Sequence, residues 1–409
     1  MCYTQNRFNA LLSACVLSLI ATAGWSQSLT WLGTLPGYDR SYAYGVSADG
    51  AVVVGWAENA AGQKRAFRWE NGVMQDLGHL GGSYSWAYGV SADGAVVVGE
   101  AYDATLRSRA FRWTASGGMQ DLGTLPGGYV SAAYAVSADG AVVVGWAQNA
   151  ESHGRASRWT ASGGMQDLGT LPGGNNSEAL GVSADVAVVV GWAANAARYQ
   201  RAFRWTASGG MQDLGALGGC CSTAYAVSAD GAVVVGRASI AGGQSRAFRW
   251  TASGGMQDLG TLPGGNNSYA YGVSADGAVV VGESGWRAFR WTASGGMEDL
   301  NTTYASLLTN RSVLREARAI SPDGRYIVGW GYNAATNRTE AFLLDTGPRC
   351  TAHNGDVDAN GCVDDADLLQ VLFAFGSTGS NLGRVDVNCD GVVDDADLLQ
   401  VLFNFGSGC

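Results

Sequence analysis

The sequence predicts an all-β repeat protein followed by a small helical module. Glycine accounts for 61 of its 409 residues, 47% are hydrophobic and only 15% are charged, which favours many short strands joined by tight turns. One phrase, close to SADGAVVVGWA, returns along most of the chain. The formal charge of −10 is concentrated in residues 350–409, where ten Asp stand against a single Arg. We therefore expect two regions of different character.

The Ser-x-Asp motif of this phrase sets a regular period. Successive copies are 44 to 47 residues apart, and turn residues divide the first copy into four strand-like segments: AYGVS, AVVVGWA, RAFRW and VMQDLG. A four-stranded unit of this length is typical of a propeller blade. The seven copies begin at Ser47, Ser91, Ser137, Ser183, Ser228, Ser274 and Ser321. These observations predict a seven-bladed β-propeller, with a solenoid as the alternative.

The two ends of the repeat region predict how the ring closes. The seventh copy ends with EAFLLD at 340–345 and lacks a fourth strand, whereas LTWLGTLPG at 29–37 precedes the first copy and aligns with MQDLGTLPG from Met119. An N-terminal strand that completed the last blade would leave no exposed sheet edge. We expect the propeller to span residues 27–347 and to be closed by this strand.

Residues 1–26 have the pattern of an export signal. Arg7 precedes the apolar run ALLSACVLSLIATAG, and Ala21 and Ala23 supply small residues for cleavage. The alternative is a lipid anchor at Cys15, which ends the lipobox-like segment LSAC. No second apolar stretch follows, so we expect a secreted, extracellular protein without a membrane span. The chain has no basic patch, which argues against nucleic-acid binding.

The segment RAFRW at Arg65–Trp69 has echoes at Arg109, Arg201, Arg246 and Arg287, and it resembles the HAF-repeat family of probable extracellular bacterial proteins. The resemblance extends from about Leu29 to Asp345, because this core recurs together with the Ser-x-Asp-Gly and Asp-Leu-Gly segments. Ser157 and Val186 are local departures from the pattern. The resemblance implies an extracellular location and no defined reaction.

Two twelve-residue acidic loops predict calcium sites in the C-terminal region. DVDANGCVDDAD at Asp356–Asp367 and DVNCDGVVDDAD at Asp386–Asp397 place Asp or Asn at loop positions one, three, five and nine, Gly at six and Asp at twelve. This spacing wraps carboxylates and one backbone carbonyl around a single point, and Ca²⁺ takes six to eight oxygen ligands. Each loop continues into an apolar helical segment. We expect two bound Ca²⁺ ions in an EF-hand-like module spanning residues 348–409.

Asp at position twelve, the tandem duplication and the C-terminal location make this module similar to the type I dockerin family. The resemblance implies side-chain ligands at Asp356, Asp358, Asn360 and Asp367, and at Asp386, Asn388, Asp390 and Asp397. Asp364 and Asp394 would act directly or through water, and the carbonyls of Cys362 and Val392 would complete the two shells.

Dockerins bind cohesin modules, so the resemblance also implies a cohesin-like module or another protein as partner. The positions that the family uses to recognise its partner, often Ser-Thr followed by a basic pair on the helix, differ in this chain. They are Asp365, Ala366, Leu372 and Phe373 in the first copy, and Asp395, Ala396, Leu402 and Phe403 in the second.

The propeller region lacks a recognisable catalytic motif, because its histidines do not recur in register or belong to a nucleophile or metal pattern. The acids at Asp76 and its five equivalents occupy one repeated fourth-strand position, where an Arg of the neighbouring strand can pair with them. We therefore expect a non-catalytic binding or assembly protein. The alternative is a secreted polysaccharide-active enzyme, a glycoside hydrolase or lyase, acting in polysaccharide catabolism.

Differences between copies concentrate in the connections from second to third strand and from fourth strand to the next first strand. Both connections emerge on one face of a propeller, and exposed rings there can stack on sugars or anchor a protein. We expect this loop face to bind a partner, possible ligands being a polysaccharide or a protein; the alternative is unconstrained loop drift. Its candidate residues are Tyr38, Tyr84, Trp86 and Tyr129.

Six cysteines lie outside the signal, an even number that fits an oxidising compartment. Cys350 and Cys409 bracket the C-terminal module, and antiparallel packing of its two helices would bring the chain ends together. We therefore expect a Cys350–Cys409 disulfide, with Cys362 as the competing partner. Cys220 and Cys221 either pair with each other or stay free.

Overall fold

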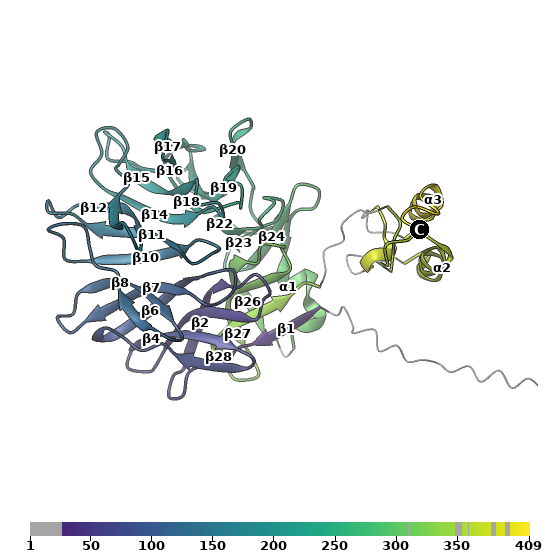
Figure 1. Ribbon diagram of the computed structural model, residues 1–409, viewed down its shortest axis with the longest axis horizontal. Coiled ribbons are helices and arrows are strands. Elements are labelled where there is room, and N and C mark those ends of the chain that lie inside the picture. Colours follow the sequence, from purple (N-terminus) through teal and green to yellow (C-terminus); the bar gives the residue numbers. More distant parts are fainter. Residues whose placement is uncertain (1–26, 310, 348–353, 359, 378–381, 389–392) are drawn as a thin grey trace, which may run out of the picture. The chain divides into compact units, whose positions relative to one another are not determined.

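The structure is a computed structural model that describes residues 27–409 except 310, 348–353, 359, 378–381 and 389–392 (Figure 1). The expected export signal and Cys15 therefore lie outside the described residues. The chain divides into two compact units, a large one over Gln27–Thr351 and a small one within Ala352–Cys409.

The large unit consists of seven four-stranded antiparallel sheets, and its first blade is β2 (Arg40–Val46), β3 (Val52–Glu58), β4 (Lys64–Glu70) and β5 (Val73–Asp76). The first strands of all seven sheets line one central channel. The fold is thus an all-β seven-bladed β-propeller, which excludes the solenoid (Figure 1).

The other six blades repeat this order. Blades two and three are β6 (Gly81–Val90), β7 (Val97–Asp103), β8 (Ser108–Thr114) and β9 (Gly118–Asp121), then β10 (Ser131–Val136), β11 (Val142–Gln148), β12 (Gly154–Thr160) and β13 (Gly164–Asp167). Blades four and five are β14 (Ser177–Val182), β15 (Val189–Ala194), β16 (Gln200–Thr206) and β17 (Gly210–Asp213), then β18 (Gly218–Val227), β19 (Val233–Ile240), β20 (Ser245–Thr251) and β21 (Gly255–Asp258). Blade six is β22 (Ser268–Val273), β23 (Val280–Ser284), β24 (Ala288–Thr292) and β25 (Gly296–Asp299).

The seventh sheet combines the two ends of the large unit. It contains β26 (Val313–Ile320), β27 (Tyr326–Asn333), β28 (Arg338–Asp345) and, as its outer strand, β1 (Ser28–Trp31). β1 runs antiparallel to β28, with Leu29 opposite Leu344 and Trp31 opposite Phe342. Two short helices, α1 (Leu300–Thr303) and η1 (Ala305–Leu307), connect blade six to blade seven.

The repeated Ser-x-Asp motif forms the turn between the first and second strands. In the third blade Ser137 Oγ donates to Asp139 Oδ1 at 2.5 Å, Asp139 Oδ1 also accepts the Ala141 N–H at 3.0 Å, and Ser137 Oγ accepts the Val142 N–H at 2.9 Å. The hydroxyl and the carboxylate thus satisfy backbone donors that the tight turn leaves without strand partners. Equivalent bonds recur in the other copies.

A second buried serine in the first strand connects neighbouring blades. Ser85 Oγ, in blade two, accepts the N–H of Ala66 in blade one at 3.0 Å and donates to the carbonyl of Gly78 at 2.7 Å. Ser41 does the same between blades one and seven, because it accepts the Ala341 N–H at 2.8 Å. The other members of this set are Ser131, Ser177, Ser222 and Ser268.

The core of the propeller lies between adjacent blades. Fully buried phenylalanines of the third strands pack against valines and alanines of the neighbouring sheet; Phe67 belongs to one such cluster with Val53 and Ala341. Each VVVG segment needs its glycine because the backbone of the adjacent strand lies very close to it. A Cβ on Gly55, for example, would lie 1.9 Å from the carbonyl oxygen of Tyr42. The repeat therefore specifies both the blade and its contact with the next one.

The C-terminal unit contains α2 (Asp365–Ala374), η2 (Gly383–Val385) and α3 (Asp395–Phe403). Its core is a set of six buried valines, three from each copy: Val357, Val363, Val371, Val387, Val393 and Val401. The two copies exchange backbone hydrogen bonds, because Val363 pairs with Gly406 and Ser407 while Val393 pairs with Gly376 and Ser377. Each loop is thus held against the chain that follows the other copy's helix.

Deletion of Leu29–Gly37 should destabilise the propeller strongly. Leu32 and Leu35 are buried against blades one and seven. Truncating one buried Leu to Ala typically costs about 2–5 kcal/mol. We therefore expect urea denaturation to show that the free energy of unfolding falls by at least about 4 kcal/mol. As a control, removal of Ala60 and Ala61 leaves a three-residue β3–β4 connection and should cost far less. An unchanged melting temperature in the Leu29–Gly37 deletion would contradict the structural role of β1.

The Ser-x-Asp turns should contribute a pH-dependent part of the stability. Hydrogen bonds from the Ser137 hydroxyl and then from the Ala141 N–H lower the pKa of Asp139. A lowered folded pKa stabilises the protein above the unfolded value of about 3.9, and this gain is lost as the pH falls through the folded pKa. Asp139→Asn should therefore have a lower free energy of unfolding than wild type at pH 7. This difference between the two proteins should narrow towards pH 3. A gap of constant size across this range would count against the account.

Candidate functional site

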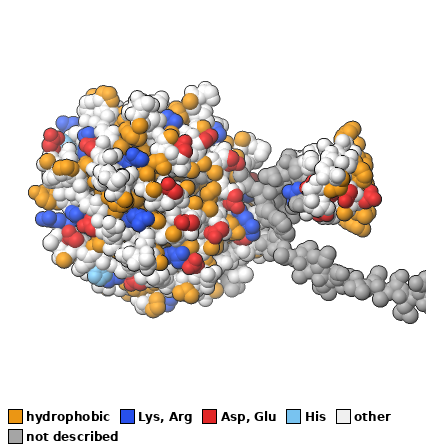
Figure 2. All heavy atoms as spheres, viewed as in Figure 1, with side chains coloured by type: hydrophobic (Ala, Val, Ile, Leu, Met, Phe, Trp, Pro, Cys, Tyr) orange, Lys and Arg blue, Asp and Glu red, His pale blue; other side chains and the backbone are white. Residues whose placement is uncertain are grey.

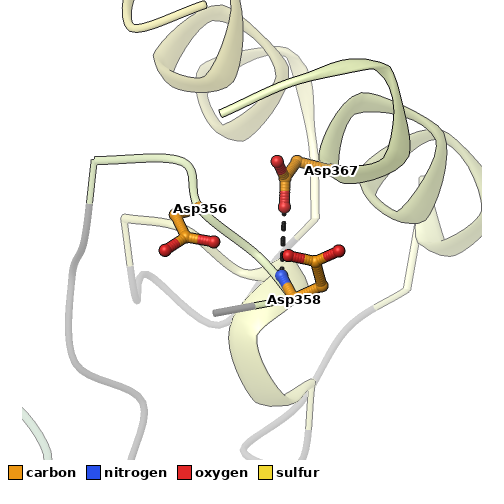
Figure 3. Close-up of side chains that lie close together, drawn as sticks. All are labelled: Asp356, Asp358 and Asp367. Atoms are coloured by element: carbon orange, nitrogen blue, oxygen red, sulfur yellow. Dashed lines mark hydrogen bonds between the residues drawn. The ribbon is translucent and has the colours of Figure 1, made fainter. Parts of the chain in front are cut away.

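The first acidic loop brings three carboxylates together. One oxygen from each of Asp356, Asp358 and Asp367 lies within 4.8 Å of the others (Figure 3). Asp367 is fully buried, and its Oδ1 accepts the backbone N–H groups of Val357 at 2.6 Å and Asp358 at 3.0 Å. Helix α2 thereby holds the carboxylate of loop position twelve against the start of the loop.

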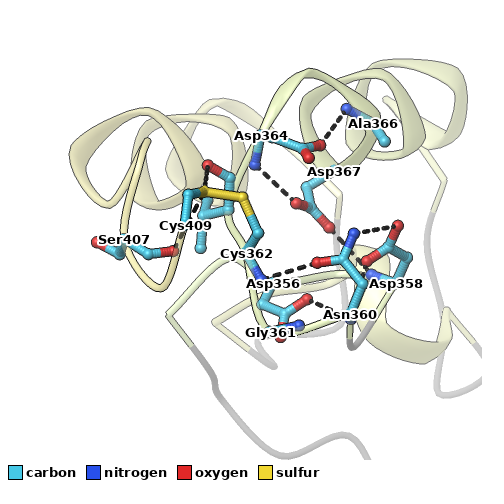
Figure 4. Close-up of a disulfide and its surroundings, with 11 residues drawn as sticks. Asp356, Asp358, Asn360, Gly361, Cys362, Asp364, Ala366, Asp367, Ser407 and Cys409 are labelled. Carbon is cyan, nitrogen blue, oxygen red and sulfur yellow. Dashed lines mark hydrogen bonds between the residues drawn. A yellow bond between two sulfur atoms is a disulfide. The ribbon is translucent and has the colours of Figure 1, made fainter.

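The remaining groups of this loop add further oxygen atoms. Asn360 Oδ1 accepts the Cys362 N–H at 2.7 Å, and Asn360 Nδ2 donates to Asp358 Oδ2 at 3.1 Å. Asp356 accepts the N–H groups of Asn360 and Gly361, both at 3.1 Å (Figure 4). Carboxylate, amide and carbonyl oxygens are the donor set that suits a hard divalent cation such as Ca²⁺. The residues present therefore fit the ion that the spacing predicts.

The second loop repeats the anchoring of the first. Asp397 is fully buried, and it accepts the N–H of Asn388 and the N–H of Asp394, both at 3.0 Å. Asp386 is also buried. Asp390 and Val392 lie outside the described residues. The described part of this loop thus has the same buried Asp at position twelve.

Asp364 and Asp394, at loop position nine, begin the two helices. Asp364 Oδ1 accepts the Ala366 N–H at 2.8 Å, and Asp394 Oδ1 accepts the Ala396 N–H at 2.8 Å. Each forms a capping box with the Asp three residues later. These residues therefore connect loop and helix, a role that the ligand pattern alone did not indicate.

The expected Cys350–Cys409 disulfide is wrong, because Cys409 is bonded to Cys362, the competing partner (Figure 4). The Cα atoms of Cys362 and Cys409 are 4.7 Å apart, within the range that a disulfide spans. The backbone pairing of Val363 with Gly406 and Ser407 brings the chain end to the first loop, which explains this choice. Cys350 lies outside the described residues. Cys220 and Cys221 are both free.

The expected partner positions are on the surface of the C-terminal unit. Asp365, Ala366, Asp395 and Ala396 are exposed in the first turns of the helices. Further along, Phe373 is 87% exposed and Phe403 is 84% exposed. The neighbouring Leu369, Leu372, Leu399 and Leu402 are exposed as well, and Figure 2 shows hydrophobic side chains on the surface of this unit. Each helix thus presents the same apolar group to solvent.

On the propeller, only part of the expected aromatic set comes together. Tyr84 and Trp86 stack with centroids 5.8 Å apart, and Tyr102 contacts both rings. Tyr129 lies outside this cluster, 56% exposed and beneath the guanidinium of Arg107. Tyr38 is partly buried against the core of blade one. The contact between Arg107 and Tyr129 joins the two kinds of variable connection, so these connections do share a face.

The repeated acids of the fourth strands are paired with arginines, as the sequence predicts. Arg109 Nε lies 3.0 Å from Asp121 Oδ2, and Arg287 Nη1 lies 2.8 Å from Asp299 Oδ2. The equivalent acids Asp76, Asp167, Asp213 and Asp258 have the corresponding partners. Their role is therefore accounted for by cross-strand pairing.

The sequence prediction missed two acids of blades six and seven. Glu283 and Glu316 are both buried and line a cavity of about 540 Å³. Burial raises the pKa of Glu283. The hydrogen bond from the Trp286 N–H lowers this pKa, and the charge of Glu316 raises it. Each acid has one counterpart, Glu100 in blade two for Glu283 and Glu178 in blade four for Glu316. The available signal was therefore that two such acids meet at one blade junction, which no other junction shows among the described residues.

The central channel contains a further departure from the repeat. Tyr44, Tyr88, Tyr134, Tyr225 and Tyr271 line it together with Leu180 and Arg318. The Arg318 guanidinium lies 4.1 Å from the ring centre of Tyr271 and 5.0 Å from that of Tyr44, and it forms an ion pair with Glu316. Arg318, which lines the channel, thus balances the charge of Glu316, which lines the cavity beside Glu283.

Comparisons with known proteins give two distant structural similarities and no family. The sequence matches no family model, and no similar curated protein is found. The chain is similar to TolB from Acinetobacter baumannii, with a TM-score of 0.45 and 11% identity over 74% of this chain and 66% of that chain, just under two thirds. It is also similar to oligogalacturonate lyase from Vibrio parahaemolyticus, with a TM-score of 0.48 and 11% identity over 78% of this chain and 93% of that chain. No helix in the described part of the chain combines the length and apolar character needed to span a membrane.

Proposed function

We propose that the chain is an extracellular, non-catalytic binding or assembly protein, in which a propeller of the HAF-repeat type carries a dockerin-like calcium-binding module. The observation that carries this proposal is the duplication in the C-terminal unit. In each copy a buried Asp at loop position twelve lies in the first turn of a helix that exposes a Leu-Phe pair. An unstructured acidic tail has no reason to repeat this combination.

Calcium would be held by Asp356, Asp358, Asn360, Asp367 and the Cys362 carbonyl in the first loop, and by Asp386, Asn388, Asp390, Asp397 and the Val392 carbonyl in the second. When bound, the ion supplies positive charge that offsets the mutual repulsion of the loop carboxylates. The chain's own contribution is the buried Asp at position twelve, whose backbone hydrogen bonds couple each loop to its helix.

The exposed apolar group on each helix supports a docking role. Two Leu-Phe pairs on a unit with only six buried valines are more apolar surface than a small soluble module usually leaves exposed. We propose that they contact a protein partner of the cohesin type, with Asp365, Ala366, Asp395 and Ala396 at the rim. The apolar N-terminal run and the Cys362–Cys409 disulfide support an extracellular setting.

The propeller would present the ligand-binding loop face. The nearly constant turns and the buried serines fix the blades, whereas the variable connections differ in sequence from blade to blade. We propose that β1 closes the ring by completing the last blade, so that blade seven does not end on an unpaired edge of β28. A rigid scaffold with variable loops is the usual basis of a binding protein.

Titration of the full chain with calcium should show uptake of two ions. An ion that binds only the folded module adds about 2.7 kcal/mol per site at a hundredfold excess over its dissociation constant. The double variant Asp356→Asn and Asp386→Asn should lose uptake in calorimetry. The matched control Asp365→Asn and Asp395→Asn changes acids at position ten and should retain both ions. Absence of calcium uptake by the wild-type chain would overturn the metal proposal.

An immobilised type I cohesin should capture the full chain in calcium and release it in chelator. Phe373→Ser together with Phe403→Ser should reduce capture at least about tenfold, since each ring contributes at least about 1 kcal/mol to a desolvated contact. Val73→Ser removes an exposed apolar side chain from the propeller and should leave capture unchanged. Capture that survives the double Phe substitution would exclude this surface, and no capture by wild type would exclude a cohesin partner.

A further inference from the structure

The cavity beside Glu283 belongs entirely to the propeller and lies where blades six and seven meet. Its walls include Asn266 and Asn267 from the connection into β22, Tyr269 from β22, Glu283 from β23, and Glu316 from β26. Trp286, from the connection between β23 and β24, completes the rim and is 63% exposed. The cavity is therefore built by the two kinds of connection that vary between blades.

Two changes to the repeat open this cavity. The β23–β24 connection has only three residues, Gly285–Arg287, whereas the other blades have four or five. Glu283 also stands where four blades have a Trp, as in Trp56 opposite Tyr42. Blade two has Glu100 in this register, but its connection is one residue longer. A smaller side chain and a shorter connection leave about 540 Å³, which is within the usual range for a small-molecule site.

The two carboxylates of the cavity have different interaction partners. Glu316 forms an ion pair with Arg318. Glu283 Oε1 accepts the Trp286 N–H at 2.5 Å, and among the described residues its other oxygen has no hydrogen-bond donor. Glu283 lines the cavity and its second carboxylate oxygen is not fully enclosed, so it can accept a hydrogen bond from a ligand.

The amides and rings supply the complementary groups. Asn267 Oδ1 accepts the Ser245 N–H at 2.8 Å, which leaves its Nδ2 as a donor. The rings of Tyr269 and Tyr271 are parallel within 4°, with centroids 6.1 Å apart. Together with Trp286 they provide apolar faces beside hydrogen-bond donors and acceptors.

We propose that this cavity binds the end of a neutral carbohydrate chain. Trp286 stacks on a sugar ring, and Glu283 accepts hydrogen bonds from the hydroxyl groups of that sugar. The inference rests on the proposed binding role of the propeller and names its site and ligand class. Sugar hydroxyls both donate and accept, and the site offers both Asn267 Nδ2 and Glu283. A quaternary ammonium ligand would use the rings and carboxylates but would have no use for the amide donor.

Calorimetry of the full chain in calcium against neutral cello-, xylo-, manno- and galacto-oligosaccharides tests this site. We expect at least one series to bind, and Trp286→Ala to weaken its affinity about tenfold, the effect of losing a stacking contact of about 1.4 kcal/mol. Tyr199→Ala is the matched control, because Tyr199 is 49% exposed in the corresponding connection of blade four and should not matter. Glu283→Ala should also weaken binding while its melting temperature reports on folding.

Three outcomes would overturn the proposal. These are no binding by any of the four series, equal loss of affinity in Trp286→Ala and Tyr199→Ala, and binding of phosphocholine in preference to every sugar. Newly formed reducing ends in the same mixtures would instead contradict the non-catalytic role. Calcium uptake and cohesin capture are measured on the same preparations, so a failure of the sugar site is distinguishable from a failure of the docking module.

Discussion

A single buried serine hydroxyl connects each of six blade junctions, and the rest of the propeller depends on it. The hydroxyl accepts an N–H from the third strand of one blade and donates to a carbonyl that follows the fourth strand, as Ser85 does with Ala66 and Gly78. Both backbone groups lie at the edge of a sheet whose fourth strand is short, and a buried group without a partner would destabilise the fold. Ser41 makes the same bridge between the first and last blades.

At the junction of blades six and seven, no described residue forms this serine bridge, and other features occur there. There the chain forms α1 and η1, and the Asn301 side chain exchanges two hydrogen bonds with the backbone of Leu314. The buried carboxylates Glu283 and Glu316 and the cavity beside them occur at this same junction. The junction that differs from the repeated serine bridge is thus also the junction where two buried glutamates meet. In a ring of nearly identical blades, this is the position where a specific ligand site fits best.

The repeated elements could be predicted from the sequence, because each depends on contacts within one period. The seven blades, their four strands and the Arg–Asp pairs all follow from local turn chemistry and alternation. The two acidic loops were predicted in the same way, since a twelve-residue spacing is a local property. Their calcium occupancy stays a prediction.

Features that depend on distant segments could not be predicted. The partner of Cys409 is decided by the backbone pairing of Val363 with Ser407, and the cavity at Glu283 by a connection shorter than its equivalents. The bridging serines are visible in six of the seven copies, but no local rule states that a hydroxyl in a first strand bonds the previous blade. The sequence places Trp286 in a variable connection, but it does not show that this connection leaves a cavity beside the ring.

Native-state amide hydrogen exchange of the full chain, in calcium and in chelator, tests the account most directly. The amides of Ala66 and Ala341 are both bonded to bridging serines. We expect them to exchange equally slowly in both conditions, because they belong to one cooperative ring. The amides of Val363 and Val393 in the C-terminal unit should be protected only in calcium. Faster exchange at Ala341 than at Ala66, or equal protection of Val363 and Val393 with and without calcium, would contradict a closed propeller joined to a metal-dependent module.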